Sequence, residues 1–420
     1  MAAPEQYPLS CPGSDCTGTN ATRGALAQMN LYAGNAAVDA RFGLHHWPLF
    51  QIGGGNGPLD RPSSPDAGRA NVRSDSLVRW MGYAAVAYGA KGLNWYCWGG
   101  GVWWYSQDKN APGRPSPMYQ TVREVNADAR AWGDELLGGG FGFAAALHTG
   151  FSDANGGGPP SPRSVVVAMD EDLLVGVFVP EDGAAPADAE RSAAAVDAYL
   201  FVVDKRVSGQ LAPVSRRNAS LWLHPSVGAA AVAPPGRQGA HGFAELRQRH
   251  RASPPPPGPR RKHCASVTRT PRGLRVSVEL VGGGGALVRL TAAPGARAAL
   301  VDACFGAGTW LFDVAAPGLN QQAQANMNVA LKAPSWAYDF WHARYRPYAG
   351  LELTAARSFE DGEETGFVLG GSLVRLSGPP VAAAEAQAWA EAGFNLLAMG
   401  APTAAELHNY SGAAVELGAW

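Results

Sequence analysis

Residues Arg79–Trp98 read RWMGYAAVAYGAKGLNWYCW, and this stretch decides the fold class. Around it, apolar residues recur at helical spacing: Leu77, Trp80, Met81, Ala84, Ala85 and Tyr88. Ser74 or Asp75 stands where an N-cap is needed, and Gly89 stands where a helix takes a left-handed residue to end. The aromatic run Leu93–Trp98 is typical of a buried strand. Helix, tight turn and buried strand are half of a βαβ unit, which predicts a parallel sheet covered by helices.

The flanking segments, and the far end of the chain, continue this α/β pattern. The apolar run Leu44–Ile52 predicts an earlier strand, and residues 122–136 place their apolar side chains on one helical face. Near the other end, Pro380–Ala392 predicts a helix and Phe394–Met399 predicts a buried strand. The sequence TAAE, which begins at Thr403, is a capping box and predicts a further helix.

Residues 141–300 follow a different pattern. Turn residues separate short strand-like runs, at Ser164–Met169, Leu173–Val179, Tyr199–Val203, Ser220–Leu223, Leu274–Leu280 and Ala286–Leu290. This pattern predicts an antiparallel β-sandwich, which we expect to fold by itself. Residues 233–262 are rich in Pro and Arg and predict a surface insertion. Residues 301–376 predict a β-rich connector that includes a strand at Phe367–Leu369.

The composition argues against several classes of function. The net charge is −1 and charged residues make up 16%, so no nucleic-acid partner is expected. No apolar run is long enough for a membrane span. The chain has no CxxC or HExxH motif and no phosphate-loop pattern, so neither a metal nor a cofactor is expected. Sequons at Asn20, Asn218 and Asn409 fit a secreted or organellar-lumen protein but also arise by chance, and the first residues show no signal peptide. Localisation and oligomeric state are not predicted.

The stretch quoted first also resembles the end of the catalytic barrel in β-galactosidase-like glycoside hydrolases. In that family a helix of the form R-x-x-x-Y-x-A-x-A-Y-G-A-K-G precedes the eighth strand, and this form matches the chain from Arg79 to Gly92. WPLFQ at Trp47–Gln51 is similar to an earlier barrel strand that ends in a sugar-facing Gln. The pattern V-x-x-V-N at Val122–Asn126 is similar to the helix that closes the barrel.

The resemblance implies a multidomain chain, α/β plus all-β, that is an incomplete polypeptide of glycosidase type. It implies the C-terminal part of a (β/α) barrel at 1–140, a β-sandwich at 141–300 and the first βα unit of a second barrel at 377–420. A (β/α)₈ barrel takes about 250 residues, so we expect no closed eight-stranded barrel within residues 1–140. The strand Phe394–Met399 then either lacks a sheet to join or lies beside Leu93–Trp98.

For function, the resemblance implies a glycoside hydrolase-like protein that acts on O-glycosidic bonds or derives from enzymes that do. Such enzymes use two carboxyl groups, roughly 5 Å apart in retaining enzymes. The two predicted barrel strands carry no Asp or Glu, and the nearest acids, Asp60, Asp66 and Asp108, lie in loops. No catalytic residue is therefore assigned, and we expect this chain to be inactive. The alternative is a non-catalytic carbohydrate-binding or structural protein on the same scaffold.

Four residues are candidates for binding carbohydrate, because pyranose rings stack on flat aromatic side chains and the carboxyl ends of barrel strands form the active face. These candidates are Gln51, Trp98, Trp103 and Trp104. The alternative for the tryptophans is packing within the loop. For Trp95, in the strand itself, packing in the core is the favoured interpretation.

Overall fold

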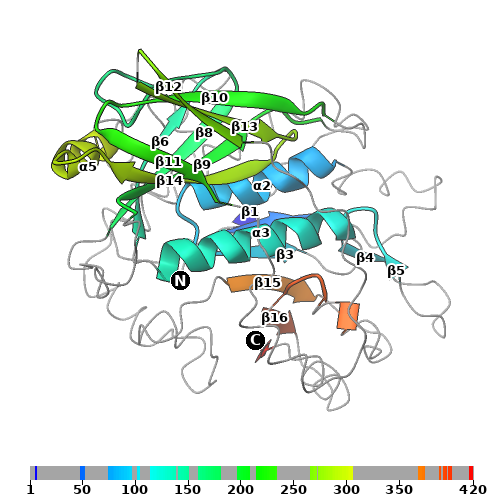
Figure 1. The fold of residues 1–420 in the computed structure, drawn as a ribbon. Helices are drawn as coiled ribbons and strands as arrows, with labels where there is room; N and C mark the ends of the chain where they lie inside the picture. Colours follow the sequence, from blue (N-terminus) through cyan, green and yellow to red (C-terminus); the bar gives the residue numbers. More distant parts are fainter. Residues whose placement is uncertain are drawn as a thin grey trace, which may run out of the picture.

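The computed structural model describes residues 5–6, 48–52, 74–96, 102–104, 114–138, 141–150, 159–180, 196–208, 214–233, 265–271, 273–305, 368–373, 387–388, 391–394, 396–399 and 416–419. These residues form a mixed α and β structure with one parallel sheet, two larger antiparallel sheets and a short antiparallel pair (Figure 1). Nearly all of the predicted insertion at 233–262 and most of the predicted helix after Thr403 lie outside the described residues, but Glu416–Ala419, expected at the end of that helix, form a strand.

The parallel sheet joins strands from both ends of the chain. Its order is β1 (Glu5–Gln6), β2 (Leu49–Gln51), β3 (Gly92–Tyr96), β15 (Val368–Leu373), β16 (Leu396–Met399) and β17 (Glu416–Ala419). The strand expected at Phe367–Leu369 is therefore confirmed as β15. The idea that Phe394–Met399 lacks a sheet is wrong, because β16 pairs with β15 and with β17. It does not lie directly beside β3 either, because β15 occupies that place.

Helices α2 (Asp75–Ala87) and α3 (Tyr119–Gly138) confirm the two helices expected in the first part of the chain. Ser74 is the N-cap of α2, and its Oγ accepts a hydrogen bond from the backbone N–H of Leu77 at 3.3 Å. Gly89 has φ +83°, the left-handed conformation expected just after a helix. From Ser76 to Ala87 every residue of α2 except Arg79 is buried, so this helix has almost no contact with water.

Residues 141–305 form the two larger antiparallel sheets and helix α5 (Arg297–Phe305). The five-stranded sheet has the order β11 (Val227–Val232), β14 (Gly285–Ala292), β9 (Ala198–Asp204), β8 (Leu173–Pro180) and β6 (Phe141–His148). The four-stranded sheet has the order β12 (Ala265–Thr270), β13 (Gly273–Leu280), β10 (Arg217–Leu223) and β7 (Val166–Met169). All six strands expected in this region are confirmed, whereas β6, β11, β12 and α5 were not expected.

The five-stranded sheet is buried on both faces. One face shares a core with the four-stranded sheet, which includes Val202, Leu221 and Val276. The other face packs on α2 and α3 through aromatic side chains, and the ring centroids of Trp132 and Phe201 lie 5.2 Å apart. Helix α2 therefore lies between this sheet and the parallel sheet (Figure 1).

Glycines allow α2 to approach its neighbours closely. A Cβ atom at Gly176 of β8 would lie 2.0 Å from the carbonyl oxygen of Ala87, and one at Gly283 would lie 1.8 Å from that of Ser76. Any side chain at either position would push the helix away from the sheet. Within the sequence GGGG at Gly282–Gly285, Gly283 is the residue that contacts the first turn of α2.

We predict that Gly176→Ala lowers the free energy of unfolding by roughly 1–3 kcal/mol, because the added methyl group meets helix backbone that has no room to move. Urea unfolding measures the change. The control is Ala231→Val at an exposed position of β11, where we expect a change within about 0.5 kcal/mol. Equal stability of Gly176→Ala and the native chain would contradict the close packing.

The double burial favours the opposite of the expectation that residues 141–300 fold by themselves, and a comparison with an isolated fragment decides between the two. A fragment of residues 141–305 exposes the aromatic face that α2 and α3 cover, whereas the whole chain retains that cover. We predict that the fragment binds the dye ANS strongly and associates in sedimentation, and that the whole chain does neither. A monomeric fragment without dye binding would show that the helices are dispensable.

Candidate functional site

The carboxyl edge of the parallel sheet is where the candidate residues were expected. Strands of a parallel sheet end at a common edge, and ligands of α/β proteins bind outside that edge. Gln51, the last residue of β2, pairs in register with Tyr96 of β3, which pairs with Ser372 of β15. The edge that carries Gln51 is thus built from both halves of the chain.

The two faces of the parallel sheet differ. Phe50 and Trp95 are fully buried against the helices, with ring centroids 4.9 Å apart, so their register row belongs to the helix-covered face. Successive residues of a strand alternate between faces. The row of Gln51 and Tyr96 therefore belongs to the face away from α2 and α3.

Trp95 is a core residue, as favoured from the sequence. Its Nε1 donates to Oδ1 of Asn126 on α3 at 2.7 Å, and Nδ2 of Asn126 donates to the carbonyl oxygen of Ala392 at 2.9 Å. The hydroxyl of Tyr119 similarly donates to the carbonyl oxygen of Ala388 at 2.8 Å. Burial, together with nearby Glu391, raises the pKa of Tyr119 to about 12, so this hydroxyl remains a donor at neutral pH. These bonds attach Ala388 and Ala392 to helix α3.

Of the two alternatives for Trp103, binding carbohydrate or packing against neighbouring side chains, the structure shows packing. It lies in β4 (Trp103–Trp104), which pairs with β5 (Arg114–Pro115), and it is only 6% exposed. Its ring meets that of Tyr119 edge-on, with centroids 6.3 Å apart. The structure gives the strand positions of Gln51 and Trp104 but not their side chains, and Trp98 lies outside the described residues.

No carboxyl pair marks this edge in the described part of the chain. The described strands of the parallel sheet end at Gln6, Gln51, Tyr96, Leu373, Met399 and Ala419. Glu5 and Glu416 belong to this sheet but lie on its two outermost strands, β1 and β17. Strands are spaced about 4.8 Å apart, so the four strands between them separate the two residues far beyond the ~5 Å of a retaining pair. Asp60, Asp66 and Asp108 lie outside the described residues.

Other reactive groups are equally sparse among the described residues. These residues hold no cluster of three His, Cys, Asp or Glu side chains suited to a metal ion. They also include no helix that is long and apolar enough to cross a membrane. Burial raises the pKa of the Cys304 thiol to about 12, so this thiol is protonated at neutral pH and is a poor nucleophile.

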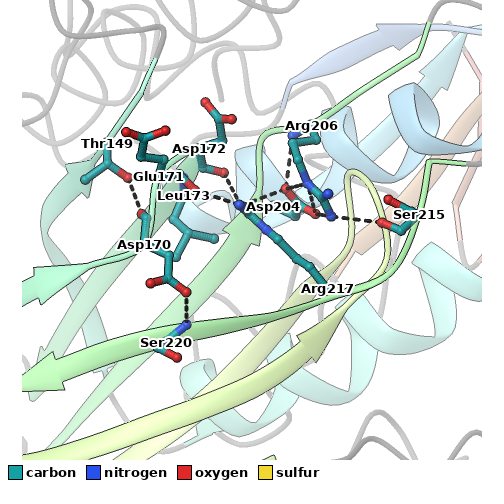
Figure 2. Close-up of polar contacts among 10 residues, drawn as sticks. All are labelled: Thr149, Asp170, Glu171, Asp172, Leu173, Asp204, Arg206, Ser215, Arg217 and Ser220. Carbon is teal, nitrogen blue, oxygen red and sulfur yellow. Dashed lines mark hydrogen bonds and ion pairs between the residues drawn. The ribbon is translucent and has the colours of Figure 1, made fainter.

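A buried charge cluster lies around Asp204, at the end of β9 (Figure 2). The carboxylate of Asp204 is fully buried and pairs with Nη2 of Arg206 at 2.8 Å and with Nη2 of Arg217 at 2.9 Å. Arg217 also donates to the carbonyl oxygens of Glu171 and Asp172 in the turn before β8. Asp172 has φ +55°, a left-handed conformation that is uncommon outside glycine.

Both carboxylate oxygens of Asp204 accept hydrogen bonds from arginine, so this group is not poised as a base or nucleophile. Arg217 begins β10 of the four-stranded sheet and Asp204 ends β9 of the five-stranded sheet, so their ion pair joins the two sheets. The cluster is a structural clamp. No local pattern in the sequence indicated it, because the pairing depends on how the sheets stack.

We predict that Asp204→Asn lowers the free energy of unfolding by roughly 3–5 kcal/mol, because it leaves two arginines without their shared counter-charge. The control is Glu279→Gln, which breaks the more exposed pair of Arg216 and Glu279 and is expected to cost about 1 kcal/mol or less. Chemical denaturation of both variants measures the difference. Similar losses in the two variants would show that the cluster is not a clamp.

Comparison of the chain with protein-family models, with curated proteins and with solved structures finds no match. The geometry of the chain itself therefore carries the functional argument.

Proposed function

We propose that the chain is a glycoside hydrolase-like protein that binds carbohydrate at the carboxyl edge of its parallel sheet. The observation that carries this proposal is the strand order β1–β2–β3–β15–β16–β17. In a (β/α) barrel the eighth strand pairs with the first, so this order is that of three final strands followed by three initial strands. On this proposal the six strands form part of one barrel, and the two antiparallel sheets form a β-sandwich that lies between β3 and β15 in the sequence.

The position of the candidate residues supports a sugar site at this edge. Gln51 ends β2 on the face away from α2, where the resemblance implies a sugar-facing Gln. Trp104 is adjacent to Trp103, and the buried ring of Trp103 anchors this hairpin strand to Tyr119 at the start of α3. An anchored hairpin loses little conformational freedom when a ligand binds to it.

The proposal is for binding rather than hydrolysis. General acid and nucleophile must converge on one glycosidic bond, and the carboxyl edge shows no such pair among the described residues. An active hydrolase that uses an acid at Asp60 or Asp108 is the competing function, and it differs in an easily measured property, which is turnover.

We predict that the chain binds neutral p-nitrophenyl glycosides and releases no p-nitrophenolate. Titration calorimetry across a panel of sugars measures binding, and absorbance measures release. Trp104→Ala and Gln51→Ala are each expected to weaken binding about tenfold, which corresponds to ~1.4 kcal/mol of lost contact. The matched control is Phe305→Ala, an exposed aromatic residue at the end of α5, which is expected to leave neutral-sugar binding unchanged.

Two results would contradict the proposal. If no glycoside of the panel bound, or if Phe305→Ala weakened binding as much as Trp104→Ala, the carboxyl edge would not be the site. If the chain released p-nitrophenolate and Asp60→Asn or Asp108→Asn abolished the release, the protein would be a hydrolase.

A further inference from the structure

The outer face of the four-stranded sheet carries a second group of polar and aromatic residues. Leu221 and Val276 point into the core between the two antiparallel sheets, so their neighbours in the strands belong to the opposite face. One register row of this outer face runs across four strands through Thr268, Arg275, Trp222 and Ala168. The outer face is the side of this sheet turned away from the five-stranded sheet, α2 and the parallel sheet (Figure 1).

Arg275 is the charged centre of this row. It is exposed, its Cζ lies 5.1 Å from the ring centroid of Trp222, and its Nη2 donates to Oγ of Ser220 at 2.8 Å. Among the described residues no carboxylate pairs with Arg275, whereas Arg216, just before the start of β10, pairs with Glu279 at 3.3 Å. The ring of Trp222 and the hydroxyl of Ser220 hold the guanidinium of Arg275 in place. In the described part of the chain this guanidinium has no counter-charge.

Hydroxyl groups surround this guanidinium. Ser266, Ser277 and Ser220 form the adjacent register row, in which Oγ of Ser220 and Oγ of Ser277 lie 3.2 Å apart. Thr268 and Ser266 on the edge strand β12 are exposed. On the other side, the register partner of Trp222 is the exposed Ala168, whose methyl group covers little of the indole.

We propose that this outer face binds an acidic saccharide, a sugar chain with a carboxylate on its pyranose rings. The guanidinium offers a planar fork of donors that matches a carboxylate, and the free part of the indole offers an apolar surface to the sugar ring. The exposed hydroxyls of Ser266 and Thr268 suit the sugar hydroxyls, which both donate and accept hydrogen bonds. This site is separate from the carboxyl edge and does not rest on the function proposed there.

The charge of the face favours a saccharide over a nucleic acid. Nucleic-acid surfaces carry several basic residues that neutralise successive phosphates. Among the described residues of this face, one unpaired arginine is flanked by hydroxyl groups and one aromatic ring, which is the composition suited to one carboxylate and several hydroxyls at a time.

Titration of the whole chain with tetragalacturonate tests the proposal, with the neutral cellotetraose as the matched ligand. Production in bacteria keeps the sequon at Asn218, on the same face, unmodified. We expect binding of tetragalacturonate that weakens as salt is raised, and at least tenfold weaker binding of cellotetraose. Arg275→Gln and Trp222→Ala are each expected to weaken tetragalacturonate binding about tenfold or more.

Arg216→Gln removes the same charge from an arginine that already has a partner, and it is expected to leave binding unchanged. Trp104→Ala, at the carboxyl edge, is also expected to leave it unchanged, so the two sites are tested apart. Thermal unfolding of each variant checks its fold, and Arg275→Lys keeps the charge should Arg275→Gln be unstable; Arg275→Lys is then expected to retain part of the binding. Absence of binding, equal binding of cellotetraose, or equal losses in Arg216→Gln and Arg275→Gln would overturn the proposal.

Discussion

Helix α2 has almost no surface left for water, and the remainder of the structure is arranged around it. One side meets the parallel sheet and α3, and the other meets the backbone of β8 at Gly176 and of the turn between β13 and β14 at Gly283. Polar contacts fix its alignment with α3: the hydroxyl of Tyr83 donates to Oδ2 of Asp128 at 2.8 Å. Burial and the carboxylate of Asp128 raise the pKa of Tyr83 well above its ordinary value, so this donor is never lost at physiological pH. A shift of α2 would separate both sheets from their common support.

Much of this arrangement could be predicted from short stretches of sequence. Helix α2, its cap at Ser74 and the buried strand β3 follow from apolar spacing and from Gly89. Strand β6, with the sequence FGFAAALH, escaped prediction because alanine and glycine carry little strand preference, and it forms because Phe141 and Phe143 pack against their neighbours. The runs LLVGVFV and AYLFVVD are apolar without alternation, which indicates burial on both faces; we interpreted them as ordinary sandwich strands.

The rest depends on contacts between distant parts of the chain. Nothing near Gly283 in sequence indicates that it will touch Ser76, and nothing near Asp204 indicates that Arg217 will neutralise it. The candidate site shows the same limit. The sequence identified Gln51 and a group of tryptophans as candidates for binding sugar. Only the packing shows that Trp103 is buried against Tyr119 and is not part of an exposed surface on which a sugar could stack. The outer face of Arg275 and Trp222 was missed because its residues come from separate strands.

The pairing of β3 with β15 has a consequence for how the protein folds while the ribosome synthesises it. Strand β3 is synthesised early, yet its partner emerges only after the residues of both antiparallel sheets. Contacts between such distant segments form slowly, because the chain must close a long loop before any pairing compensates for it. Throughout that delay one edge of β3 and the apolar side of α2 are open to other molecules. We expect the nascent chain to depend on chaperones that shield apolar segments until β15 arrives.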